Sequence, residues 1–196
     1  MDRYATNPNE DEFLPNKLGL IDRDAINEEE AAGFLRAEHD AIDALSEKTI
    51  FSLDYLYDLH KSALGSMYDF AGNLRTVNMS KGDFMFASAQ FLPQTLAAFA
   101  EEYLAPIHVR DWQKSEILDH LAALHAELLY IHPFREGNGR VVRLFTRLVH
   151  VAKTGADLDF ELITKDHNFE RYIAAIQQTL KKEYGLMQEL FRELHA

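Results

Sequence analysis

Apolar residues recur at helical spacing through most of the chain. The strongest run extends from Asp111 to Ile131, where leucine and isoleucine side chains keep returning to one face. It should end at His132-Pro133, because the residue before a proline is pushed out of the helical region. Weaker periodic stretches predict further helices over residues 27–45, 53–66, 90–104, 140–153, 166–183 and 186–194. The pattern therefore predicts an all-α fold of about seven helices.

One segment departs from the helical period. Val77 and Met79 alternate with polar neighbours before residues 80–83, and Phe84 and Phe86 alternate in the same way after them. Alternation on both sides of a glycine-containing turn is typical of a short β-hairpin. The exposed edge of such a hairpin accepts an extended peptide as an added strand. The alternative is a hairpin whose phenylalanines simply cover the core.

Length and composition fit one globular domain. The chain has 196 residues, of which 47% are hydrophobic, and a chain of this size buries about 70% of its unfolded surface. Residues 1–20 are polar, contain two prolines and show little periodicity, so we expect an extended or mobile lead-in before a single domain over residues 21–196. The absence of cysteine excludes disulfides, a zinc-thiolate site and a cysteine nucleophile.

Charge and hydropathy limit the kinds of binding partner that can be expected. The net charge is −12, and residues 1–48 carry most of the excess of acids over bases, which argues against binding to nucleic acid. No apolar run of about 18 residues is present, so no membrane partner is expected. The N-terminal residues do not resemble a secretory signal, which makes a cytoplasmic location the expectation.

Basic residues gather late in the chain. Between residues 131 and 147 a single acid, Glu136, accompanies four arginines: Arg135, Arg140, Arg143 and Arg147. Such a cluster in an acidic chain indicates either an anion ligand or an ordinary basic helix face.

The residues at the start of this basic helix favour an anion. Gly137 and Gly139 bring bare backbone to a helix N-terminus, where unpaired N–H groups and the helix dipole attract negative charge. Arg140 and Arg143 add forked donors that suit phosphate oxygens. This loop is therefore a candidate phosphate-binding site.

Two further side chains add chemistry to the same loop. Glu136 is an oxygen ligand of the kind that holds Mg²⁺ against phosphates. His132 carries an imidazole, whose unperturbed pKa is about 6.5, and is a candidate base. His125 lies on roughly the same helix face, but it has no cysteine or carboxylate at ligand spacing and is better explained as a polar core residue. Together these residues favour nucleotide chemistry.

The run from His132 to Arg140, followed by Arg143, resembles the signature of Fic (filamentation induced by cAMP) domain proteins, His-Pro-Phe-x-(Asp/Glu)-Gly-Asn-Gly-Arg-x-x-Arg. Residues 68–72 and 80–87 are similar to the segment that leads into the substrate-binding hairpin of that family, the flap. The likeness covers about residues 15–190. It implies a Fic-type helical bundle with one short β-hairpin flap.

The resemblance implies a protein adenylyltransferase that transfers AMP from ATP to a Tyr, Thr or Ser hydroxyl of a target protein. His132 would be the general base. Glu136 would hold Mg²⁺. Arg140 and Arg143 would bind the β- and γ-phosphates beside an anion hole formed by Gly137, Asn138 and Gly139. The flap residues that would hold the target are Ser80, Lys81, Gly82, Asp83 and Phe84.

Other activities are compatible with this motif. The same scaffold transfers UMP, phosphocholine or a phosphoryl group in some relatives, although the phosphoryl-transferring relatives lack counterparts of Gly139 and Arg143. A non-catalytic helical module that merely binds a nucleotide is a third interpretation.

Many family members carry an inhibitory glutamate in the pattern (Ser/Thr)-x-x-x-Glu-(Gly/Asn), which is absent here. Only relaxed matches occur, at residues 6–10 and 179–183. We therefore expect a toxin whose restraint, if present, comes from a separate antitoxin-like protein that places a glutamate on Arg143.

Overall fold

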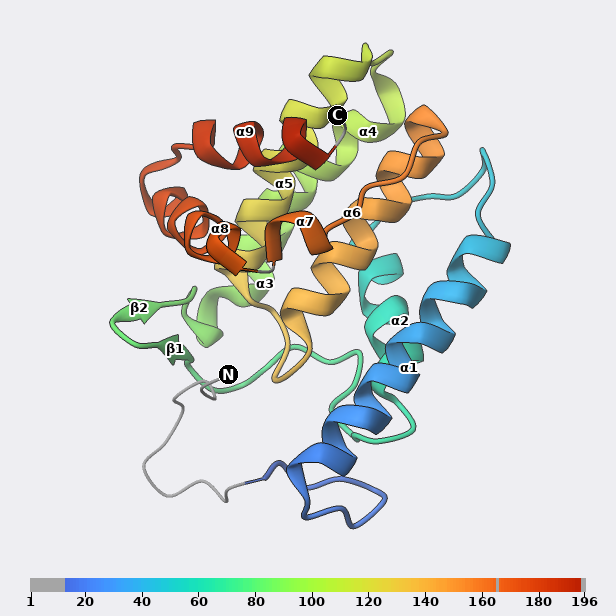
Figure 1. Ribbon diagram of the computed structural model, residues 1–196, viewed down its shortest axis with the longest axis vertical. Helices are drawn as coiled ribbons and strands as arrows, with labels where there is room; N and C mark the ends of the chain where they lie inside the picture. Colours follow the sequence, from blue (N-terminus) through green and yellow to red (C-terminus); the bar gives the residue numbers. More distant parts are fainter. Residues whose placement is uncertain (1–12, 165, 195–196) are drawn as a thin grey trace.

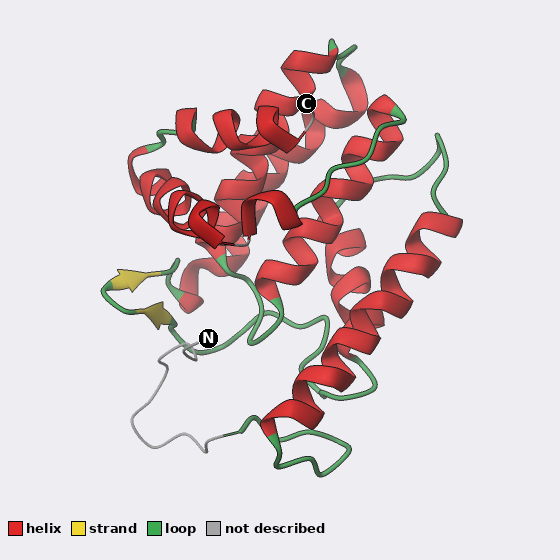
Figure 2. Ribbon diagram, in the orientation of Figure 1, coloured by secondary structure: helices red, strands yellow, loops and turns green. Residues whose placement is uncertain are grey.

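The computed structural model describes residues 13–164 and 166–194. Helices dominate these residues, and the strands described form one two-stranded antiparallel sheet (Figure 2). The expected all-α fold with one hairpin is confirmed. The helices are α1 (Arg23–Asp43), α2 (Leu53–Leu64), α3 (Leu92–Phe99), α4 (Ala105–Val109), α5 (Lys114–Ile131), α6 (Asn138–Thr154), α7 (Glu161–Thr164), α8 (Asp166–Gln178) and α9 (Gly185–Leu194).

Helices α5 and α6 form the centre of the bundle. α1 and α2 pack on one side of them, and α8 and α9 pack on the other (Figure 1). Leu121, Leu124 and Leu128 of α5 are fully buried, as are Val141 and Phe145 of α6. Because α5 is covered by neighbours on several sides, its apolar residues are not confined to a single stripe.

Capping residues determine where several helices begin or end. Ser52 caps α2 by accepting a hydrogen bond from the Tyr55 N–H (3.2 Å). Gly155 ends α6 with a φ of +70°. The predicted start of the first helix at Asn27 is wrong, because Asp22 accepts a hydrogen bond from the Ala25 N–H (2.8 Å) and begins α1 at Arg23.

Two stretches that were each expected to form one helix are divided into shorter elements in the structure. Residues 90–104, expected to form one helix, comprise the end of a 3₁₀ turn (Ala89–Phe91), α3 and a π-helical turn (Ala100–Leu104) that continues into α4. The helix expected over residues 166–183 ends at Gln178 and is followed by a 3₁₀ turn, Thr179–Lys181. None of the helices in the described ranges combines the length and the apolar character needed to cross a bilayer.

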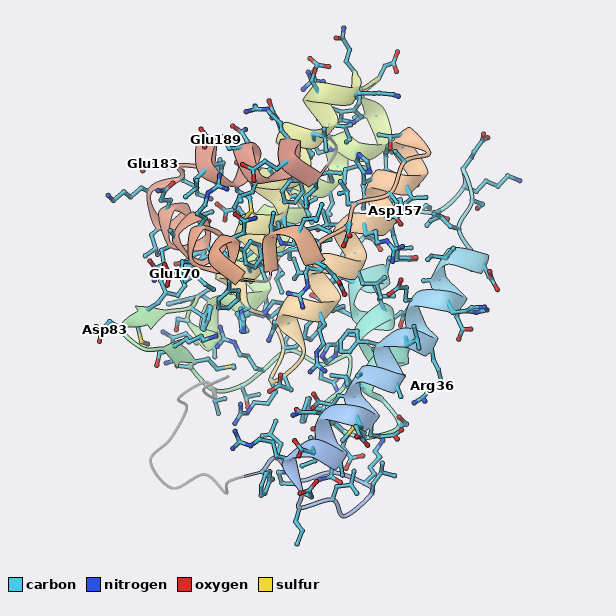
Figure 3. All side chains as sticks on the ribbon, in the orientation of Figure 1. Arg36, Asp83, Asp157, Glu170, Glu183 and Glu189 are labelled. Carbon is cyan, nitrogen blue, oxygen red and sulfur yellow. The ribbon has the colours of Figure 1, made fainter. Side chains whose placement is uncertain are left out.

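The hairpin is shorter than its alternating pattern suggested. β1 (Ser80–Lys81) pairs with β2 (Phe84–Met85), with Ser80 opposite Met85 and Lys81 opposite Phe84. Gly82 takes a φ of +57° in the turn, a conformation that favours glycine. Asp83 lies at the outer tip of the hairpin (Figure 3). Val77 lies outside the ladder, and its carbonyl accepts a hydrogen bond from the Arg75 side chain (2.6 Å).

Residues 1–12 of the expected lead-in, and with them the relaxed inhibitory match at residues 6–10, lie outside the described residues. Residues 13–20 form no helix or strand, yet the Lys17 N–H donates to the Met67 carbonyl (2.7 Å). Phe13, Leu14 and Leu20 are partly buried against the core. This part of the lead-in is therefore packed on the domain.

Candidate active site

The signature residues form the loop between α5 and α6, residues 132–137, and the first turns of α6. The side chain of Asn138, the first residue of α6, is almost fully buried and makes two hydrogen bonds to Phe134. Its Oδ1 accepts from the Phe134 N–H (2.8 Å), and its Nδ2 donates to the Phe134 carbonyl (2.7 Å). The side chain thus braces the loop, which leaves the backbone N–H of Asn138 as its contribution to an anion hole.

A second brace comes from His60 of α2. Its Nε2–H donates to the Glu136 carbonyl (2.9 Å), its Nδ1 accepts from the Gly72 N–H (2.8 Å), and its ring stacks on Phe134 with centroids 3.8 Å apart. Burial lowers the pKa of His60 to about 4, which keeps the ring neutral in this arrangement. No motif marks His60 as a site residue, although its spacing of four residues from Leu56 and from Leu64 places it on the buried face of α2.

Arg75 ties the hairpin to the loop. Its guanidinium donates to the carbonyls of His132 (2.7 Å), Val77 (2.6 Å), Ile131 (3.2 Å) and Ala87. The side chain is almost fully buried. Sequence analysis missed this residue too, because every one of these acceptors is a backbone carbonyl and leaves no trace in the pattern of residue types.

His132 occupies a strained position at the mouth of the loop. Its φ of 52° and ψ of 60° lie in the left-handed region, which costs energy for a residue other than glycine. Its Nδ1 donates to the Leu129 carbonyl (3.0 Å), so Nε2 is the nitrogen that carries the lone pair in the neutral ring. Burial lowers the pKa of His132 to about 3, and the ring is neutral at physiological pH.

A pocket of about 770 Å³ lies in front of His132. Its polar end is formed by the predicted residues His132, Glu136, Gly137, Asn138, Gly139, Arg140 and Arg143. Lys81 and Phe84 of the hairpin also line it, whereas Ser80, Gly82 and Asp83 are not among the described lining residues. Its apolar part comes from residues that the sequence did not indicate: Phe13, Leu14, Ile26, Phe86, Phe169, Tyr172, Ile173 and Ile176.

Arg140 is held against α1. Its Nη2 donates to Glu30 Oε2 (2.5 Å), and Glu136 Oε1 lies 3.7 Å from the same nitrogen. The guanidinium carbon sits 4.8 Å from the centre of the Phe34 ring, within the range of a cation–π contact.

Arg143 lies alongside Gly139. A Cβ on Gly139 would approach Arg143 Nη1 to 3.1 Å, so the glycine makes room for the guanidinium. The positive charge of Arg143 acts on the Tyr172 hydroxyl and opposes the rise in its pKa that burial causes, and this hydroxyl donates to His125 Nε2 (2.7 Å). His125 Nδ1 donates to Thr146 Oγ1 (3.0 Å). The prediction that His125 is a polar core residue is confirmed, and its contacts extend to the site through Tyr172.

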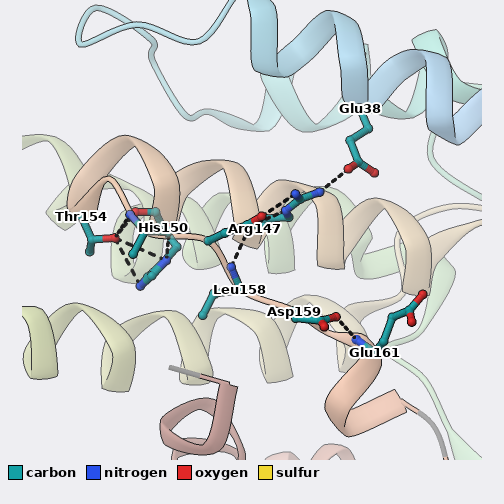
Figure 4. Close-up of polar contacts among 9 residues, drawn as sticks. Glu38, Arg147, His150, Thr154, Leu158, Asp159 and Glu161 are labelled. Atoms are coloured by element: carbon teal, nitrogen blue, oxygen red, sulfur yellow. Dashed lines mark hydrogen bonds and ion pairs between the residues drawn. The ribbon is translucent and has the colours of Figure 1, made fainter. Parts of the chain in front are cut away.

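Arg147 is separate from the pocket. It pairs with Glu38 of α1 and with Asp157, where Nη2 lies 2.6 Å from Oδ2 (Figure 4). Arg140, Arg143 and Arg147 recur at i, i+3 and i+7 along α6, a spacing that puts them on one face of the helix. The structure divides that face: Arg140 and Arg143 line the pocket, and Arg147 joins α6 to its neighbours.

Glu136 fits a site for Mg²⁺ shared with phosphates. Its carboxylate lines the pocket, and Oε1 accepts from the Gly137 N–H (2.8 Å). Within the described part of the chain, no group of three or more His, Asp or Glu side chains is arranged to hold a metal alone. Mg²⁺ commonly binds through one or two carboxylates together with substrate phosphates, which is compatible with this single carboxylate.

The chain is similar in sequence to curated protein adenylyltransferases. The protein adenylyltransferase VbhT of Bartonella schoenbuchensis is 32% identical over 135 residues, which cover 66% of this chain. The matched part of the chain spans only 27% of that protein.

Solved structures show the same fold. The N-terminal Fic domain of Bep8 from Bartonella sp. 1-1C gives a TM-score of 0.81 at 20% identity, covering 97% of this chain and 93% of that one. BepC from Bartonella tribocorum, solved with bound AMPPNP, gives a TM-score of 0.72 at 22% identity, covering 93% of this chain and 92% of that one.

A family model, the Fic/DOC family, matches residues 50–149. That match extends over just over half of the chain, and it contains α2, the hairpin, α5 and the whole loop that carries His132. This chain belongs to the Fic/DOC family.

Proposed function

We propose that this chain is a protein adenylyltransferase that moves AMP from ATP to a Tyr, Thr or Ser hydroxyl of a target protein. The observation that carries the proposal is that one pocket brings a neutral imidazole, two arginines and a helix N-terminus together. Relatives whose similarity covers more than half of this chain are named protein adenylyltransferases, which supports the same activity.

The polar end of the pocket suits a triphosphate. The first N–H groups of α6 have no partner within the helix and point toward the loop. Arg140 and Arg143 flank this helix end, and we assign them to the β- and γ-phosphates respectively. The AMPPNP bound to BepC supports a nucleotide in this fold.

The apolar part of the pocket suits the adenine ring. Phe169, Ile173 and Ile176 of α8 line it together with Leu14 and Ile26. Apolar walls with a few polar groups at one end are typical of sites for small organic ligands. We therefore place the base beside α8 and the phosphates at the start of α6.

Glu136 would hold Mg²⁺ in this site. When bound, the ion neutralises part of the phosphate charge and orients the phosphates. The Gly137 N–H bond to Oε1 keeps the carboxylate beside the helix N-terminus, and burial raises the pKa of Glu136.

His132 would act on the target hydroxyl. The Nδ1–H bond to the Leu129 carbonyl leaves Nε2 to accept the proton of that hydroxyl. As the hydroxyl oxygen bonds to the α-phosphorus, the bond from that phosphorus to the bridging oxygen breaks and pyrophosphate leaves. The proton stays on Nε2, where the nearby phosphate charge favours the imidazolium ion.

The hairpin would hold the target protein. Residues 80–85 form a two-stranded ladder whose Lys81 and Phe84 line the pocket. We propose that an extended segment of the target adds to the edge of this ladder, which would bring its hydroxyl toward His132.

The activity requires a supply of ATP, which the cytoplasm offers, and we propose a cytoplasmic location.

We also propose that a separate antitoxin-like protein restrains this enzyme through Arg143. The relaxed inhibitory match at residues 179–183 does not provide the restraint within the chain, since Glu183 is exposed beyond the end of α8 (Figure 3). Copurification of the chain with a small glutamate-bearing protein, and loss of inhibition on replacing that glutamate, would support this restraint.

Isotopic labelling tests the reaction. The chain is incubated with Mg²⁺, a host lysate and ATP labelled on either the α- or the γ-phosphate. We expect protein-bound label only from the α-phosphate. Label from the γ-phosphate would indicate phosphoryl transfer instead, and label from neither, with nucleotide still bound, would indicate a non-catalytic module.

A further inference from the structure

A second carboxylate, besides that of Glu136, lines the pocket: that of Glu30 in α1. It is only 5% exposed, and it comes from a helix outside the signature loop. A carboxylate beside a triphosphate site is repulsive unless a cation compensates it. Its presence there calls for an explanation in terms of its partners.

Both oxygens of Glu30 are engaged. The Tyr68 hydroxyl donates to Oε1 (2.6 Å), and Arg140 Nη2 donates to Oε2 (2.5 Å). Tyr68 is itself buried and stacks on Phe70, with ring centroids 4.7 Å apart. The carboxylate is therefore held at one oxygen by Tyr68 and at the other by Arg140.

The helix that carries Glu30 is also fixed. At Gly33, one turn later, a Cβ would come within 2.1 Å of the Ala63 carbonyl oxygen, which shows how closely α1 approaches α2. Phe34, four residues after Glu30, presents its ring to the Arg140 guanidinium. One face of α1 thus holds Arg140 through an ion pair and a ring contact.

Arg140 retains donors for a ligand. A guanidinium has five N–H donors, and the side chain of Arg140 is 30% exposed while that of Glu30 is 6% exposed. Glu30 engages Nη2, and Arg140 also lines the pocket, so its other donors are available to a ligand bound there. A long, flexible side chain that is already oriented loses less conformational entropy when it binds a phosphate.

We infer that Glu30 is a positioning residue, which with Tyr68 holds Arg140 in the orientation that binds the nucleotide phosphates. This inference rests on the proposed function, because it takes a phosphate as the ligand of Arg140. The opposite role, a carboxylate that competes with phosphate for Arg140, predicts the reverse change in affinity.

The chain offers a matched control. Glu38 and Arg147 form another carboxylate–arginine pair between α1 and α6, two turns further along, and neither residue lines the pocket (Figure 4). A general effect of losing an ion pair between these helices would follow from Glu38→Gln as well as from Glu30→Gln. An effect on the nucleotide would follow from Glu30→Gln alone.

The experiment measures the Kd of a non-hydrolysable ATP analogue with Mg²⁺ by calorimetry, and the melting temperature of each variant. We expect Glu30→Gln to weaken binding about tenfold and Tyr68→Phe about threefold, since each removes one link that orients Arg140. Glu38→Gln should leave the Kd unchanged. If Glu30→Gln binds the analogue as tightly as the wild type, or more tightly, the inference is wrong.

A double-mutant cycle shows whether Glu30 acts through Arg140. We expect Arg140→Gln to weaken binding, and Glu30→Gln to add nothing in that background. A full additional loss would overturn the inference. Tyr68→Phe keeps the carboxylate and tests the same link if Glu30→Gln does not fold. Because binding is measured without a target, a wild type that binds the analogue but transfers no AMP would contradict the proposed function alone.

Discussion

The ring of Phe86 stacks on the imidazole of His132, with centroids 3.9 Å apart. Phe86 directly follows β2, and Arg75 hydrogen-bonds the backbone carbonyls of both Ala87 and His132. The hairpin and the candidate base are therefore one packed unit. Movement of the hairpin would change the environment of the imidazole.

Replacing Phe86 tests this coupling. In Phe86→Ala, water reaches the His132 ring, so its pKa should rise from about 3 toward the ordinary value near 6.5. We expect AMP transfer to fall about 10- to 100-fold, since the ring loses the contact that orients it. The pKa is followed by NMR titration of the imidazole. Met85→Ala, at an exposed position of the same hairpin, is the control and should change neither quantity.

Gly139→Ala should separate stability from nucleotide binding. Gly139 is in α6 and its φ is not positive, so alanine is compatible with the backbone and stabilises the helix by up to about 1 kcal/mol. The new Cβ displaces the Arg143 guanidinium, however, because it would lie 3.1 Å from Nη1. We expect weaker ATP binding at an equal or higher melting temperature. Gly185→Ala, where a Cβ meets nothing within 4 Å, should leave binding intact.

Tyr172→Phe should loosen Arg143 without touching the loop. The variant removes the buried hydroxyl that Arg143 acts on electrostatically and that donates to His125. We expect a several-fold increase in the KM for ATP. The free energy of unfolding should fall by about 1–3 kcal/mol, because His125 Nε2 loses its hydrogen-bond donor inside the core. An unchanged KM would show that the Tyr172 hydroxyl does not orient Arg143.

Stability should fall on mild acidification. Burial lowers the pKa of His60 to about 4, that of His132 to about 3, and that of His125 well below its usual value. Above pH 6.5 these rings are neutral in both states. Below it, the unfolded chain binds protons that the folded chain does not, so the free energy of unfolding falls as the pH drops toward 4. Each such histidine contributes about 1.4 kcal/mol per pH unit.

Urea unfolding between pH 7.5 and 5 measures this dependence. His60→Gln should reduce the slope by about one proton, whatever its effect on stability at neutral pH. A free energy of unfolding that stays level from pH 7 to pH 5 would contradict the burial of these rings.

The part of the site that was predictable is local in sequence. The His132 contact to Leu129 and the Asn138 contacts to Phe134 span three or four residues, so neighbouring residue types reflect them. Glycine at a positive φ and proline after a helix leave equally local signals. The polar end of the pocket could therefore be predicted.

The supporting residues could not be predicted in the same way. His60 meets Glu136 across 76 residues, Arg75 meets His132 across 57, and Glu30 meets Arg140 across 110. These contacts follow from how α1, α2 and the hairpin pack on α6, which no local pattern specifies. The error at the start of α1 has a different cause, since two good capping residues, Asp22 and Asn27, compete and side-chain geometry decides between them.

The central claim is that His132 accepts the proton of a target hydroxyl while the pocket holds ATP. Mass spectrometry of a host lysate treated with the wild type or with His132→Ala, in ATP and Mg²⁺, tests it most directly. We predict AMP on protein hydroxyls with the wild type and none with His132→Ala, although both bind an ATP analogue. Equal modification by the two proteins would contradict the account.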